Sequence, residues 1–76
     1  MDRQQFLDQI AAIDLQIGHI KERNRPIARA IALGHASRIS EDDQQQCARD
    51  NEEVRRLAEQ KRVLRIQLSE SDALIA

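Results

Sequence analysis

The stretch FLDQIAAIDLQIGHIKERNRPIARAI, residues 6–31, decides the fold of this chain. Large apolar side chains recur in it at alternating steps of four and three residues. This is the heptad spacing of a helix that packs on other helices, and strands, whose side chains alternate every second residue, do not produce it. The positions of this first seam are Phe6, Ile10, Ile13, Ile17, Ile20, Asn24, Ile27 and Ile31.

The composition of the whole chain also favours helices. The 76 residues are 41% hydrophobic and 33% charged, carry a net charge of −1, and include one aromatic residue, Phe6. A disordered chain has a lower apolar content, and a β-sandwich needs more aromatic residues and turn glycines. We expect one domain over residues 1–76, which is too small to bury much surface on its own.

Export and membrane signals are missing from the sequence. Residues 1–30 lack an uninterrupted apolar stretch of signal-peptide type, and the longest uncharged stretch, residues 30–37, is too short to span a bilayer. The single cysteine, Cys47, cannot form a disulfide within the chain. We therefore expect a cytoplasmic protein that does not bind membranes.

The ends of two long helices can be read from a few residues. Gly34 follows the first seam and can adopt the left-handed conformation that ends a helix, and Ser40 precedes three carboxylates as an N-terminal cap does. These signals predict helices over about residues 2–33 and 41–70, with fraying after about Ser69. Pro26 should kink the first helix; a break into two helices at Pro26 is the alternative.

The second helix has a weaker seam than the first. Its apolar positions are Cys47, Val54, Leu57, Leu64 and Leu68, and Asp50, Lys61 and Ser71 interrupt them. Residues 21–38 are net basic and residues 39–53 net acidic, so a chain that folds back near residues 34–40 places opposite charges side by side. The predicted fold is an antiparallel helical hairpin in which Asn24 lies level with Asn51 and Lys61 level with Asp14.

A hairpin of this kind leaves its seams partly open to water. Isoleucine at both the a and d heptad positions favours bundles of three or four helices over a two-stranded coil. We therefore expect a homodimer or a higher homo-oligomer, with a four-helix bundle as the leading arrangement. The predicted self-association residues are Phe6, Ile10, Ile13, Ile17, Ile20, Ile27, Ile31, Val54, Leu57, Leu64 and Leu68.

Patterns for catalysis and metal binding are missing. His19 falls at an outer heptad position and His35 in the predicted turn, and neither has a serine or cysteine at a spacing that would supply a nucleophile. The chain contains no paired-cysteine motif and no Glu-x-x-His motif. We expect no enzyme activity, no cofactor and no metal.

Arginines and off-seam aliphatic residues are the candidates for binding a partner. Paired with acidic neighbours, the arginines form a solvated face; gathered on one side, they form a basic patch for RNA, a nucleotide or an acidic protein surface. Val63 and Ile66 lie off the seams, one helical turn apart, as do Leu15 and Leu33. The partner-binding candidates are Arg23, Arg25, Arg29, Arg55, Arg56, Arg62, Val63, Arg65 and Ile66.

Two resemblances bear on function. The stretch Ile10-Ala-Ala-Ile13-Asp14-x-x-Ile17, followed by Arg23, resembles the opening of the all-helical chorismate mutases and implies a catalytic arginine at Arg23. The lysine that this family carries further on has no counterpart here, and the chain is too short for the family's third helix. Helical-hairpin RNA-binding regulators of plasmids are similar to this chain in architecture alone.

These observations predict a small non-enzymatic helical protein that binds another protein. It would act as a regulator, adaptor or inhibitor of that partner, as small phage- and plasmid-encoded proteins do. An RNA- or nucleotide-binding helical bundle that uses the arginines is the alternative. An enzyme of the chorismate mutase type is a third and more remote reading.

Overall fold

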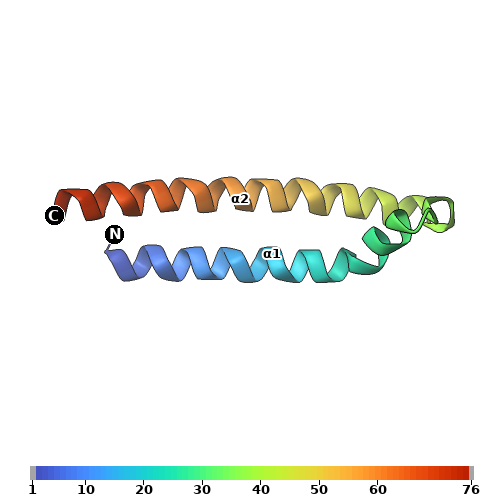
Figure 1. Cartoon of the computed structure of the whole chain (residues 1–76), viewed down its shortest axis with the longest axis horizontal. Helices are drawn as coiled ribbons and strands as arrows, with labels where there is room; N and C mark the ends of the chain where they lie inside the picture. Colours follow the sequence, from blue (N-terminus) through green and yellow to red (C-terminus); the bar gives the residue numbers. More distant parts are fainter. Residues whose placement is uncertain (1, 76) are drawn as a thin grey trace.

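The fold consists of two long helices joined by a short connection (Figure 1). The computed structural model describes residues 2–75, which form α1 (Arg3–Ala32), the 3-10 helix η1 (Ala36–Arg38), α2 (Glu41–Ile75) and no strand. The predicted all-helical class is therefore confirmed. In Figure 1, α1 and α2 lie side by side and run in opposite directions, so the start of α1 and the end of α2 are at the same end of the molecule.

A capping box starts α1. The carboxylate of Asp2 accepts a hydrogen bond from the backbone N–H of Gln5 at 2.8 Å, and the Gln5 side chain accepts one from the backbone N–H of Asp2 at 3.0 Å. The helix then runs without interruption through Pro26, so the alternative of two separate helices is wrong. Figure 1 shows the last turns of α1 bending toward α2.

The connection between the helices follows the backbone chemistry expected for it. Gly34 has a φ of +79°, and the N–H of His35 donates to the carbonyl of Ala30 at 2.8 Å, which completes a Schellman motif. The hydroxyl of Ser40 accepts from the N–H of Asp43 at 3.1 Å and so caps α2. The predicted helix end at Gly34 and the predicted cap at Ser40 are both confirmed.

The end of α2 extends beyond the predicted limit. The helix continues to Ile75, whereas the predicted end was about residue 70. This end of α2 contacts the start of α1: the guanidinium of Arg3 lies 2.7 Å from the carboxylate of Asp72, and both Ser71 and Asp72 are half-buried.

The core between the helices is small. Among residues 2–74, only Phe6 (7% exposed) and Leu57 (3% exposed) are buried apolar residues. The other seam residues are half-buried, namely Ile10, Ile13, Ile17, Ile20, Ile27, Val54, Leu64 and Leu68. Ile31 differs, since it is 53% exposed. The first turns of α2, residues 41–46, carry only acidic side chains and glutamines, so they offer Ile31 no apolar partner.

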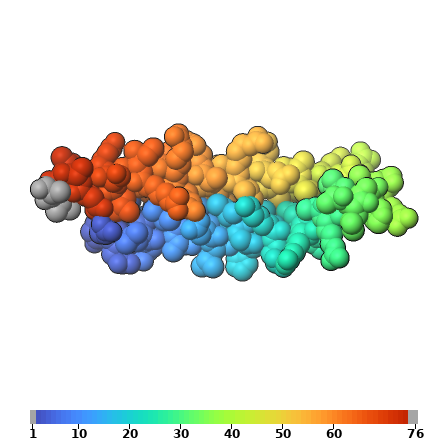
Figure 2. Space-filling model, in the orientation of Figure 1, coloured from blue at the N-terminus to red at the C-terminus, as the bar shows by residue number. Residues whose placement is uncertain are grey.

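The helix pair is long and flat. Its Cα atoms extend over 55 × 19 × 14 Å, and the side chains of α1 and α2 form two rows along the molecule (Figure 2). Its accessible surface is 5939 Å². The scaling for compact monomeric proteins gives only about 4,700 Å² for a chain of 8.7 kDa. Two packed helices therefore leave much of the surface of their shared seam open.

Candidate functional site

A polar cluster lies midway between the helices, around the carboxylate of Asp50. Asp50 is 5% exposed, and its oxygens accept hydrogen bonds from the side-chain amides of Asn24 at 2.8 Å and Gln46 at 3.0 Å. The guanidinium of Arg23 contacts the same carboxylate through Nη2 at 2.8 Å and Nε at 3.3 Å. The hydrogen bond from Asn24, followed by those from Arg23 and Gln46 and the positive charge of Arg23, holds the pKa of Asp50 below its ordinary value, although burial opposes this.

The buried polar atoms in this cluster all have partners. Among the residues that the structure describes, no buried side-chain nitrogen or oxygen lacks a hydrogen bond. Asn24 also donates to the backbone carbonyl of Ile20 at 3.1 Å, so its amide is fixed between the two helices. A buried polar group within an apolar seam fixes which residues lie opposite each other. The cluster therefore sets the register of α1 on α2.

The partner of Asn24 differs from the predicted one. We expected Asn51, but the structure places Asp50 opposite Asn24 and leaves Asn51 exposed. Consecutive helical residues point about 100° apart, so only one of these two positions can face α1. The interruption of the second seam at Asp50 was the signal in the sequence that could have identified it.

Two other contacts between the helices agree with the predicted register. The ammonium group of Lys61 forms an ion pair with the carboxylate of Asp14, as expected. Arg3 and Asp72 form the second pair, which the sequence analysis did not identify. Together with the Asn24–Asp50 contact, these two pairs connect α1 and α2 at three points along their length.

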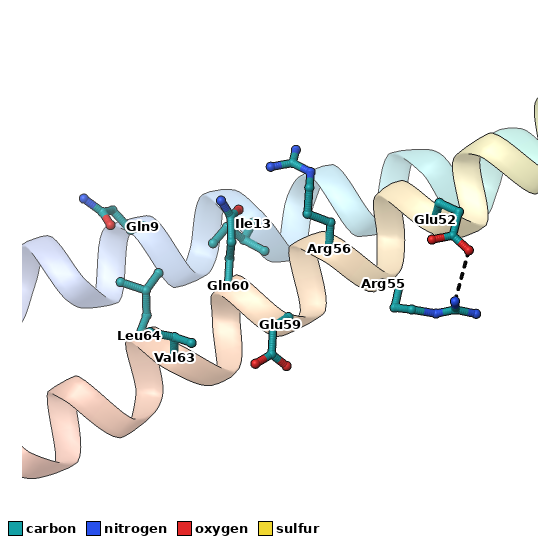
Figure 3. A pocket seen from close by; sticks show the side chains of 9 residues that line it. All are labelled: Gln9, Ile13, Glu52, Arg55, Arg56, Glu59, Gln60, Val63 and Leu64. Atoms are coloured by element: carbon teal, nitrogen blue, oxygen red, sulfur yellow. Dashed lines mark hydrogen bonds and ion pairs between the residues drawn. The ribbon is translucent and has the colours of Figure 1, made fainter.

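A groove runs along one side of the helix pair, and we call it the glutamine groove (Figure 3). It encloses about 620 Å³. Its floor is uncharged and consists of Gln9, Ile13, Gln60, Val63 and Leu64. Its rim on α2 consists of Glu52, Arg55, Arg56 and Glu59, with Arg55 paired to Glu52 at 3.0 Å.

The opposite side of the helix pair is much more charged. Val63 and Arg65 are two positions apart on α2 and so point about 200° from each other. Val63 lines the glutamine groove, whereas Arg65 lines a shallower groove on the other side. We call the latter the charged groove; it is lined by Asp14, Ile17, Lys21, Val54, Ala58, Lys61, Arg62 and Arg65.

The candidate arginines are distributed over both sides. Arg55 and Arg56 line the glutamine groove, and Arg62 and Arg65 line the charged groove. Most of them pair with a carboxylate one helical turn away: Arg25 with Glu22, Arg55 with Glu52, Arg56 with Glu53 and Arg62 with Glu59. Among the described residues, Arg29 and Arg65 form no ion pair with a carboxylate. The structure therefore does not gather the arginines into one patch.

Two of these ion pairs change the acidity of their members. The hydrogen bond and positive charge of Arg56 lower the pKa of Glu53, and those of Arg62 lower the pKa of Glu59. The pKa values of Arg56 and Arg62 are raised in return by their carboxylate partners. All four side chains are exposed or partly exposed, so salt screens these pairs.

Several large aliphatic side chains are exposed, most of them outside both grooves. Leu15 is 66%, Leu33 61% and Ile66 45% exposed, and Val63 on the groove floor is 41% exposed. Leu7 (38%) and Leu74 (88%) are exposed as well, although the sequence analysis did not single them out. The off-seam position of these two leucines was the available signal.

The two histidines and the single cysteine are the remaining side chains that could take part in chemistry. His19 and His35 are exposed, and Cys47 is a half-buried free thiol. Within residues 2–75, no three His, Cys, Asp or Glu side chains are grouped so that they could hold a metal ion. None of the helices formed by these residues combines the length and apolar character needed to cross a membrane.

Comparison with known proteins does not assign this chain to a family. No protein-family model, curated protein or solved structure matches the chain. The contacts and surfaces of the helix pair are therefore the basis of the functional proposal.

Proposed function

We propose that this chain acts without catalysis, by binding another protein as a small regulator, adaptor or inhibitor. We further propose that two copies of the helix pair form a four-helix bundle as the framework for this binding. The observation that carries the proposal is the incomplete burial of the apolar residues: of those described, only Phe6 and Leu57 are buried between α1 and α2. Half-buried isoleucines along a flat pair of helices gain most by contact with further helices.

The aliphatic side chains outside the grooves support binding of a different protein in addition to a second copy of the chain. Leu15, Leu33 and Ile66 are exposed and line neither the glutamine groove nor the charged groove, so they form a surface separate from both. Exposed aliphatic residues beside polar ones are typical of surfaces that contact other proteins. We propose that these residues contact the regulated protein.

No contact in the structure supports the two alternative functions, nucleic-acid binding and mutase-type catalysis. The single aromatic residue, Phe6, is buried, so it is not accessible for stacking on a base. Arg23, on which a mutase-type activity would depend, has its guanidinium on the buried carboxylate of Asp50. The arginines that would contact nucleic acid mostly neutralise neighbouring glutamates.

Affinity capture with matched variants tests the proposal. The tagged full chain is incubated with cell lysate, and bound proteins are identified by mass spectrometry and quantified for Leu15→Glu, Leu33→Glu and the control Gln45→Glu. Gln45 is exposed and polar, so the control adds the same charge away from the aliphatic side chains. We expect one partner that the wild type and the control bind equally and that the leucine variants lose. Repeated capture without a partner, or equal capture by all variants, would contradict the proposal.

A further inference from the structure

The two sides of the helix pair differ in their ability to contact an identical surface. Four basic residues and one acidic residue line the charged groove: Lys21, Lys61, Arg62, Arg65 and Asp14. Asp14 and Glu59 neutralise Lys61 and Arg62, so Lys21 and Arg65 carry the excess positive charge. In a two-fold contact the same surface faces itself, so this side would bring these like charges together. Like charges that face each other across an interface oppose association. The charged groove is therefore a poor surface for self-association.

The glutamine groove has the opposite character. Its floor carries three aliphatic side chains, Ile13, Val63 and Leu64, and no charge. Gln9 and Gln60 add side-chain amides, which carry both hydrogen-bond donors and an acceptor. An amide can therefore pair with the amide of an identical surface, which an ammonium or a guanidinium group cannot do.

The rim of the glutamine groove is also self-complementary. It carries two glutamates and two arginines, Glu52, Glu59, Arg55 and Arg56, so its charges cancel. Charged residues are depleted from the centres of protein interfaces and tolerated at their rims. This distribution, an uncharged floor with a balanced rim, suits contact between two copies of the same chain.

The amount of open surface matches what a dimer needs. The accessible surface of 5939 Å² exceeds that of a compact monomer of this mass by about 1,200 Å². A stable interface of standard size buries about 800 Å² on each partner. A second helix pair laid on one side therefore accounts for most of the excess surface.

We propose that a second copy of this chain seats on the glutamine groove, related by a two-fold axis, so that the two helix pairs form a four-helix bundle. The inference rests on the proposed function, because it names the side through which that bundle forms. Val63, 41% exposed in the single helix pair, becomes a central contact of the interface. The charged groove stays on the outside of the bundle.

Sedimentation equilibrium on full-length variants tests which side is covered. Val63→Glu places a carboxylate on the floor of the glutamine groove, whereas Ala58→Glu places one in the charged groove, where Ala58 is exposed. We expect the wild type and Ala58→Glu to have twice the monomer mass of 8.7 kDa and Val63→Glu to have the monomer mass. Circular dichroism confirms that each variant is helical.

A milder pair of variants keeps the test decisive if Val63→Glu does not fold. Val63→Ala shortens the side chain without adding charge and should raise the dimer dissociation constant about tenfold, while Leu15→Ala, outside both grooves, should leave it unchanged. Dissociation by Ala58→Glu but not by the Val63 variants would overturn the assignment of the groove, and so would a monomeric wild type. A dimer that captures no partner would instead contradict the proposed partner binding and support the groove assignment.

Discussion

The side-chain amide of Asn24 donates a hydrogen bond to the carboxylate of Asp50 over 2.8 Å, and this contact ties the middle of α1 to the middle of α2. Both residues are polar side chains at seam positions, where apolar residues are usual. Each would therefore be buried without a partner if one helix slid along the other. An unpaired buried carboxylate is costly, and this cost disfavours other registers of the two helices. The pair thus reduces the apolar contact between α1 and α2 but favours a single register of the two helices.

The Asp50 cluster makes stability depend on pH. The pKa of Asp50 is lowered in the folded chain, so its carboxylate stabilises the fold above the ordinary aspartate pKa of 3.8, and this contribution is lost as the pH falls below that value. We expect Asp50→Asn to be less stable than the wild type at pH 7 and to lose less stability between pH 5 and pH 3. Urea unfolding at matched protein concentration measures both. Identical pH profiles for the two proteins would rule out this role for Asp50.

Leu57 is the most buried apolar residue described, with 3% exposure. Leu57→Ala removes most of its contacts and leaves a cavity, so we expect the free energy of unfolding to fall by about 2–4 kcal/mol. Leu15→Ala deletes the same atoms at a position that is 66% exposed, and the change should stay below about 0.5 kcal/mol. Equal effects of the two substitutions in urea titrations would show that α1 and α2 do not pack at Leu57.

The two glycines should respond in opposite directions to alanine. Gly34 has a φ of +79°, which strains any L side chain, so Gly34→Ala should destabilise the chain by about 1 kcal/mol. Gly18 lies within α1, and a Cβ there meets no atom within 4 Å, so Gly18→Ala should stabilise by about 0.5–1 kcal/mol. Thermal unfolding at equal concentration compares them. Stabilisation by Gly34→Ala would contradict the Schellman turn at the end of α1.

Partner capture should not depend on Arg29 and Arg65, the two candidate arginines that form no ion pair among the described residues. Replacing both Arg29 and Arg65 with glutamate reverses two unpaired positive charges, yet leaves the glutamine groove intact. We expect the double variant to capture the same protein as the wild type, with little change between 50 and 300 mM salt. Loss of capture in this variant, together with a steep decline in wild-type binding as salt rises, would favour the nucleic-acid alternative.

Much of the fold could be predicted because local signals specify it. The heptad spacing of residues 6–31 predicts a helix, Gly34 predicts its end, and Ser40 predicts the start of the next. The missed details depend on contacts between helices. The far end of α2 is held by Arg3 on Asp72, and Ile31 is exposed because polar residues begin α2. Spacing along one helix does not contain this information.

The candidate site was harder to predict for a related reason. Heptad positions identify Val63 as off the seam, but they do not show that it lies beside Ile13 and Leu64 on an uncharged floor. Likewise, a count of arginines does not show that Arg56 and Arg65 lie on opposite sides of α2. Both facts follow from how α2 is rotated against α1, which the Asn24–Asp50 pair fixes.

The molar mass of the wild-type chain in solution tests the central claim most directly. We propose that the apolar seam left open by two helices is covered by a second copy, so sedimentation equilibrium over a range of concentrations should show a dimer of the 8.7 kDa chain that dissociates on dilution. A mass of 8.7 kDa at every concentration, with cooperative unfolding that does not depend on concentration, would contradict the account.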